Sequence, residues 1–76
     1  MIKEHDRVVL TKAVADQRLE AGDVGTVVHL YGDHKAYEVE FVALDGHTVA
    51  VATVEAPDVR PVTASEIPHA RELAAA

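Results

Sequence analysis

The sequence predicts an all-β fold, a small five-stranded antiparallel barrel followed by a short C-terminal tail that is helical or disordered. Two observations carry this prediction. Short runs rich in valine and other β-formers are separated by turn residues, and an Asp-Gly pair stands between two of these runs. With 76 residues, the chain is long enough for a single domain only. We expect the barrel to span 1–62 and the tail to span 63–76.

The expected strands follow one another with one long loop, from 11 to 22, after the first. The third is the clearest, because Tyr37, Val39 and Phe41 alternate with Glu38 and Glu40 and so predict one buried and one wet face. The five strands are expected near 6–11, 24–31, 36–43, 47–54 and 59–62. The side chains expected in the core include Val8, Val39, Phe41, Val51 and Val59.

Glycine and proline mark where the strands bend and end. Gly25, inside a strand pattern, predicts a bulge or a close approach of another backbone. Asp45-Gly46 predicts a hairpin, and Pro61 places the last strand at an edge of the sheet. Five strands, one long loop and a bent strand together predict an SH3-like barrel. In the tail, Ser65 is a candidate cap for a short helix.

Composition limits the class of protein. The net charge is −6, which disfavours binding to nucleic acid phosphates and to anionic lipids. The chain has no cysteine, which excludes disulfides and thiolate zinc sites. No secretory signal and no apolar stretch long enough to span a bilayer is visible, so we expect a cytoplasmic protein that does not bind membranes.

No residues predict catalysis, a cofactor or a metal site, and we expect the protein not to be an enzyme. The histidines are scattered and lack the spacing of zinc ligands; they are His5, His29, His34, His47 and His69. Ser65 is the only serine and lies in the tail, where a nucleophile would not be held rigidly. Glu38 and Glu40 are expected to be solvated on their strand face.

An apolar strip is the candidate binding surface. The fourth expected strand carries alanine and valine where a solvated strand would carry charge. We predict that a protein-binding surface is formed by outward-facing Val27, His29, Ala50, Ala52 and Val54. An equally weighted alternative is that the long loop or the tail of the same chain covers this strip.

Several segments resemble a family of small bacterial proteins catalogued as domain of unknown function 4926. The similarity spans 2–62 and is carried by Gly-Asp-Val-Gly-Thr-Val-Val from Gly22, by Tyr-Glu-Val-Glu-Phe from Tyr37, by Asp45-Gly46 and by Val-Arg-Pro-Val from Val59. The pattern is more distantly similar to SH3-like accessory chains, such as the variable chain of ferredoxin–thioredoxin reductase. That resemblance implies docking onto a larger protein. The ribosomal KOW motif shares the Gly-x-Val pattern, but such modules are basic.

These observations favour a non-enzymatic interaction or accessory module that docks on a larger protein or self-associates. The alternative is an antitoxin-like or regulatory small protein that neutralises a basic partner. A nucleic-acid-binding SH3-like domain is third, because the chain is acidic.

Overall fold

The computed structural model describes residues 1–73, and within them the chain is all-β, as predicted. The five strands are β1 (Arg7–Leu10), β2 (Val24–Tyr31), β3 (Ala36–Val42), β4 (Thr48–Glu55) and β5 (Val59–Pro61). Two short 3₁₀ helices accompany them in the described part of the chain, η1 (Ala15–Gln17) after β1 and η2 (Ala56–Asp58) before β5.

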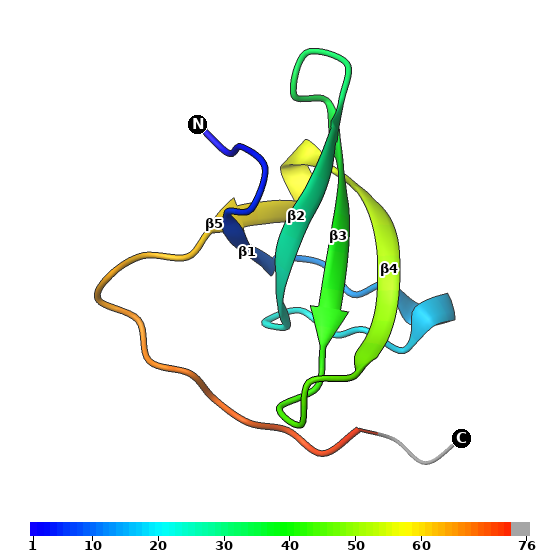
Figure 1. Cartoon of the computed structure of the whole chain (residues 1–76), viewed down its shortest axis with the longest axis vertical. Helices are drawn as coiled ribbons and strands as arrows, with labels where there is room; N and C mark the ends of the chain where they lie inside the picture. Colours follow the sequence, from blue (N-terminus) through cyan, green and yellow to red (C-terminus); the bar gives the residue numbers. More distant parts are fainter. Residues whose placement is uncertain (74–76) are drawn as a thin grey trace.

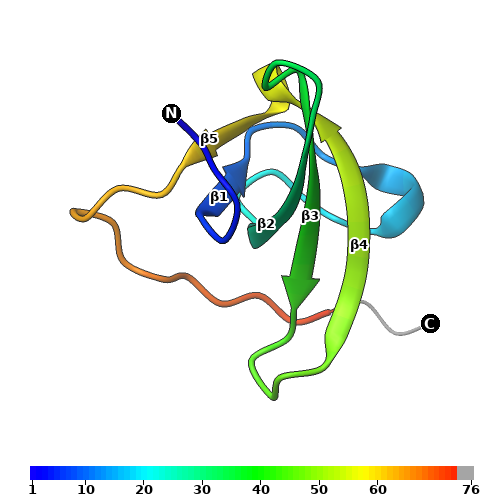
Figure 2. The same ribbon diagram turned by 45° about the horizontal axis from the view of Figure 1, so that its top comes forward.

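The strands form one antiparallel sheet in the order β4-β3-β2-β1-β5 (Figure 1). Because β1 lies between β2 and β5, the last strand returns to the first and the sheet curls around a core (Figure 2). Pro61 lies in β5, an edge strand, as its missing N–H predicts.

Strand β2 contains one irregularity and one close contact with β3. The register with β3 shifts between Val27 and His29, so the bulge lies at Val28 and not at Gly25. Gly25 instead allows a close approach, because a Cβ there would lie 2.5 Å from Val39 Cγ1 and 2.9 Å from the Glu40 carbonyl oxygen. No other residue type fits this position without displacing β3.

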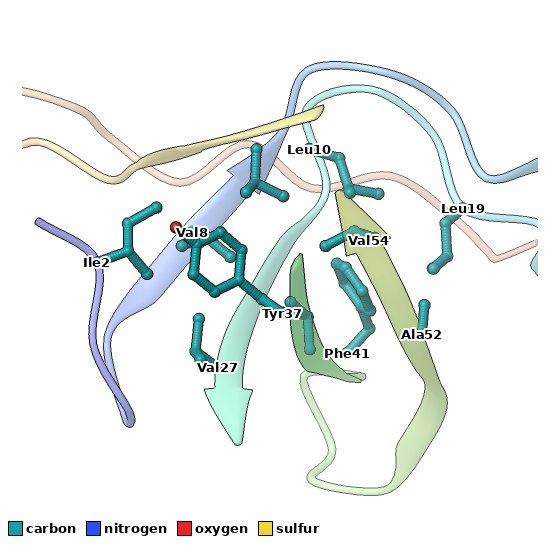
Figure 3. Close-up of a cluster of buried hydrophobic side chains, with 11 residues drawn as sticks. Ile2, Val8, Leu10, Leu19, Val27, Tyr37, Phe41, Ala52 and Val54 are labelled. Atoms are coloured by element: carbon teal, nitrogen blue, oxygen red, sulfur yellow. The ribbon is translucent and has the colours of Figure 1, made fainter. Parts of the chain in front are cut away.

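The core is formed by side chains from every strand, together with Ile2 near the N-terminus and Leu19 from the long loop (Figure 3). Val8, Val39, Phe41 and Val59 are buried, as predicted. The prediction for Val51 is wrong, because this side chain is 44% exposed. It lies opposite Glu40, on the outward side of the sheet.

The tail contains no helix between residues 63 and 73; residues 74–76 lie outside the described part. A short helix is marginal in water, and here the residues that would begin one are engaged otherwise. The Glu66 carboxylate accepts the Thr63 N–H at 2.8 Å and pairs with the Arg60 guanidinium. The tail swings away from the sheet and returns beside the β3–β4 hairpin (Figures 1 and 2).

Candidate protein-binding surface

Most residues of the predicted apolar strip face the core, so the prediction that they face outward is wrong. Val27 is 0% exposed, Ala52 is 1% exposed and Val54 is 4% exposed. Ala50 is partly buried against the core. Of the five predicted contact residues, His29 alone is exposed.

Strand register explains the inversion. In the β3–β4 ladder, Val54 lies opposite Tyr37. Ala52 likewise lies opposite Val39, and Ala50 lies opposite Phe41. The side chains of such pairs point to the same face of the sheet. Because Tyr37, Val39 and Phe41 point into the core, their partners on β4 point into the core as well.

The long loop covers the inner side of β4, which matches the alternative of a cover within the same chain. Leu19 is 3% exposed and belongs to the same cluster as Ala52 (Figure 3). A hydrogen bond also links the loop to β4, since Gln17 Nε2 donates to the Val51 carbonyl oxygen at 3.1 Å.

The exposed side of the sheet is formed by the opposite set of residues, and we call it the outer face. It consists of the outward-pointing residues of β2, β3 and β4, namely Thr26, His29, Tyr31, Glu38, Glu40, Val42, Thr48, Val51 and Thr53. Cross-strand pairing sets Glu40 between Thr26 and Val51. In the next row, Glu38 lies between His29 and Thr53. Two carboxylates thus occupy the centre of a three-stranded surface.

Hydroxyl groups hold these two carboxylates in place. The Thr53 hydroxyl donates to Glu38 Oε1 at 2.5 Å, and the Tyr31 hydroxyl donates to the same oxygen at 3.3 Å. The Thr48 hydroxyl donates to Glu40 Oε2 at 2.6 Å. Partial desolvation of its ring, together with the nearby Glu38 carboxylate, raises the pKa of Tyr31. Tyr31 therefore stays protonated and remains a donor at neutral pH.

The outer face carries negative charge without compensation from its own strands. None of the seven lysines and arginines lies in β2, β3 or β4. Among residues 1–73, no ion pair includes Glu38 or Glu40. Since hydroxyl donors orient a carboxylate but leave its charge, the centre of this face attracts cations.

Apolar side chains surround the two carboxylates. Val42 is 47% exposed at the end of β3, and Tyr31 is 41% exposed on β2, where its ring meets the His29 ring edge-on at 4.6 Å. Val28, in the bulge, is 40% exposed. Exposed aromatic and aliphatic groups around a few fixed polar groups are typical of protein interfaces.

The histidines stay apart. Within residues 1–73, no three histidine or carboxylate side chains come together as a metal site would require. The His47 ring is paired within its own turn, because its Nδ1 lies 2.5 Å from Asp45 Oδ1 between β3 and β4.

No helix in the described part of the chain has the length and apolar character needed to cross a membrane.

Comparison with known proteins gives one match. The model of a family described as Domain of unknown function (DUF4926) matches residues 4–61, in agreement with the similarity seen in the sequence. No curated protein and no solved structure matches the chain.

Proposed function

Because the chain belongs to the family described as Domain of unknown function (DUF4926), we propose its function from the surface itself: it is a non-enzymatic protein-interaction module whose outer face docks on a basic surface of a larger protein. The observation that carries this proposal is the pair of hydroxyl-held carboxylates, Glu38 and Glu40, on the outward side of three strands, β2, β3 and β4, that contain no lysine or arginine.

The arrangement of the strands supports an SH3-like barrel as the scaffold. β1 lies between β2 and β5, a long loop follows β1, and a 3₁₀ turn leads into β5. Such a scaffold does not determine function by itself. The proposal therefore depends on the outer face, where three strands present side chains from rigid elements. A role as an accessory module of a bacterial cytoplasm stays a prediction.

Charge favours protein over nucleic acid as the partner. The net charge of −6 and the acidic outer face oppose a phosphate backbone, whereas a lysine- or arginine-rich protein surface is complementary to both. An antitoxin-like role, in which the module neutralises a basic partner, would use the same contact. Long-range attraction would speed association, and the flanking valines and Tyr31 would supply the desolvated contact area.

The test compares two charge-matched double variants. Glu38→Gln with Glu40→Gln removes two charges from the outer face while keeping shape and hydrogen bonding. Glu4→Gln with Asp16→Asn removes two charges from exposed positions elsewhere. A protein captured by the tagged wild-type chain is purified, and its affinity for each variant is measured by calorimetry.

We expect the outer-face variant to bind at least about tenfold more weakly and the control to stay within about twofold of the wild type, since one lost charged contact is worth about 1.5–3 kcal/mol. If both variants weakened binding equally, the net charge of the protein, and not the outer face, would account for the loss of affinity. No weakening by the outer-face variant would exclude the outer face as the contact surface.

A further inference from the structure

The C-terminal tail contacts the end of the long loop through one side chain, Arg71. The guanidinium of Arg71 lies against the turn formed by residues 18–23. Its Nε donates to Asp23 Oδ1 at 2.8 Å, and its Nη2 donates to Asp23 Oδ2 at 2.6 Å. Nη2 also donates to the Arg18 carbonyl oxygen at 3.2 Å, and Nη1 lies 3.6 Å from Glu20 Oε2. All three nitrogens are thus engaged, in the forked geometry that arginine offers and lysine does not.

The turn that accepts the guanidinium is held in place by hydrogen bonds that do not involve Arg71. The Glu20 N–H donates to Asp23 Oδ2 at 2.9 Å, and the Asp23 N–H donates to the Glu20 carbonyl oxygen at 3.0 Å, which closes the turn. The turn is tied to β1, because the Leu10 N–H donates to the Asp23 carbonyl oxygen at 2.9 Å. Leu10 is 1% exposed, so the turn is anchored to a strand whose side chain is buried in the core.

Burial separates this contact from an ordinary surface ion pair. The Asp23 side chain is 17% exposed and the Arg71 side chain is 27% exposed. The hydrogen bonds from Arg71 hold the pKa of Asp23 below its usual range. Asp23 also accepts the Glu20 N–H, a hydrogen bond that does not depend on Arg71.

A groove continues from this anchor, and the tail fills it incompletely. The groove measures about 700 Å³ and lies between the loop, the β3–β4 hairpin and tail residues 68–73. Apolar side chains that line it remain open to solvent, since Val24 is 48% exposed, Val42 is 47% exposed and Leu44 is 96% exposed. A segment with larger apolar side chains would cover more of this surface than the tail does.

The connection to the tail allows release. Residues 63–70 are exposed, and Ile67 is 87% exposed. Arg71 makes every side-chain hydrogen bond seen between residues 68–73 and the barrel within the described chain. The tail also lies outside residues 4–61, the part that matches the family.

We propose that the 18–23 turn and the adjoining groove form a docking site for an extended, arginine-bearing segment of another protein, and that the chain's own tail occupies this site in cis as a competitor. Asp23 and the Arg18 carbonyl oxygen receive the arginine, and Val24, Val42 and Leu44 receive its apolar neighbours. This site goes beyond the proposed function, because its anchor, Asp23, lies outside the outer face; the two surfaces share Val42 at their border.

The test uses the full-length chain and a labelled synthetic peptide with the sequence of residues 65–73. Binding is measured by fluorescence anisotropy to the wild type, to Arg71→Ala and to Arg7→Ala, a control that removes the same charge from an exposed position of β1. A linked tail acts at an effective concentration on the order of millimolar, so emptying the site should tighten peptide binding by about tenfold or more.

We expect Arg71→Ala to bind the peptide at least about tenfold more tightly than the wild type and Arg7→Ala to bind like the wild type. Adding Asp23→Asn to Arg71→Ala, or replacing the peptide's own arginine by alanine, should abolish binding. Adding Glu38→Gln and Glu40→Gln to Arg71→Ala should leave the tight peptide binding unchanged, which separates this site from the proposed function.

Equal binding of the peptide to the wild type and to Arg71→Ala, or no binding to Arg71→Ala at millimolar concentration, would overturn the proposal. Light scattering on the wild type completes the test. A dimer that disappears in Arg71→Ala would assign the site to the tail of a second copy and would also overturn it.

Discussion

A pair of lysine substitutions at neighbouring positions of β4 tests which face of this strand is buried. Ala52 is 1% exposed and lies opposite Val39, whereas Val51 is 44% exposed and lies opposite Glu40. The same side chain is therefore added to the core by Ala52→Lys and to the solvent side by Val51→Lys.

The expected costs differ by several kcal/mol. At position 52 the three added methylenes have no space, which costs about 1–3 kcal/mol, and the ammonium is desolvated at a further cost of several kcal/mol. A domain of 76 residues has a total stability of roughly 4–11 kcal/mol. Ala52→Lys should therefore unfold most of the protein. At position 51 the ammonium reaches water and Glu40, and the change in stability should stay within about 1 kcal/mol.

Urea unfolding followed by circular dichroism measures both changes against the wild type. We expect a normal transition for Val51→Lys and no folded baseline, or a midpoint shifted far toward zero urea, for Ala52→Lys. If Ala52→Lys were as stable as Val51→Lys, position 52 would be solvated and the register described above would be wrong.

Three substitutions test the burial of Phe41, the close contact of Gly25 with β3, and the ion pair between Arg60 and Glu66. One binding assay tests whether the partner is a nucleic acid. Phe41→Ala should cost about 3–5 kcal/mol, seen as a large drop in melting temperature; an unchanged melting temperature would place the ring outside the core. Gly25→Ala should cost about 1–3 kcal/mol, because the new Cβ meets Val39 at 2.5 Å and a main-chain carbonyl at 2.9 Å; stability equal to the wild type would contradict this contact. The guanidinium of Arg60 lowers the pKa of Glu66 to about 2, so the stabilisation from this pair is present above the ordinary glutamate pKa and disappears as pH falls toward 2. In an NMR titration, Arg60→Gln should return Glu66 toward its ordinary pKa. At physiological salt, binding to RNA or DNA should be no tighter than about 10⁻⁴ M, and a micromolar, salt-sensitive affinity would refute the acidic-surface argument.

The outer face of β3 could be predicted from the residues of that strand, but the residues of β4 do not show which of its faces is outer. In β3, Glu38 and Glu40 mark the solvent side because an unpaired carboxylate is not buried. Residues 48–54 contain no charge, so both faces of β4 have the same local pattern. The missing information was the register with β3, which is a contact between strands.

One signal in the sequence could have supplied that register. An ideal two-residue Asp45-Gly46 turn pairs residue 44 with residue 47, which sets Phe41 opposite Ala50 and turns Ala50 inward. The actual turn is one residue longer, since the Ala43 N–H donates to the His47 carbonyl oxygen. A shift between Phe41 and Val42 then restores the register of the shorter turn. The longer turn and the register shift cancel each other, so the argument from a two-residue turn would have predicted correctly that Ala50 faces the core.

The arginine site shows the opposite case. Arg71 and Asp23 are 48 residues apart in sequence, and neither stands in a recognisable motif. Charged residues in a tail and in a loop are usually solvated, so composition gives no reason to join them. The contact exists because the Glu20–Asp23 turn stands on β1 and the tail returns past it.

By itself, then, the sequence determined the strands, their turns, the buried face of β3 and the acidic character, because each depends on residues that are neighbours in the chain. The tertiary structure decided which side of β4 faces solvent, that Glu38 and Glu40 share the outer face with exposed valines, and that Arg71 occupies a site on the loop. These features depend on pairing and packing between distant segments, whose energies depend on which side chains meet after the sheet has closed.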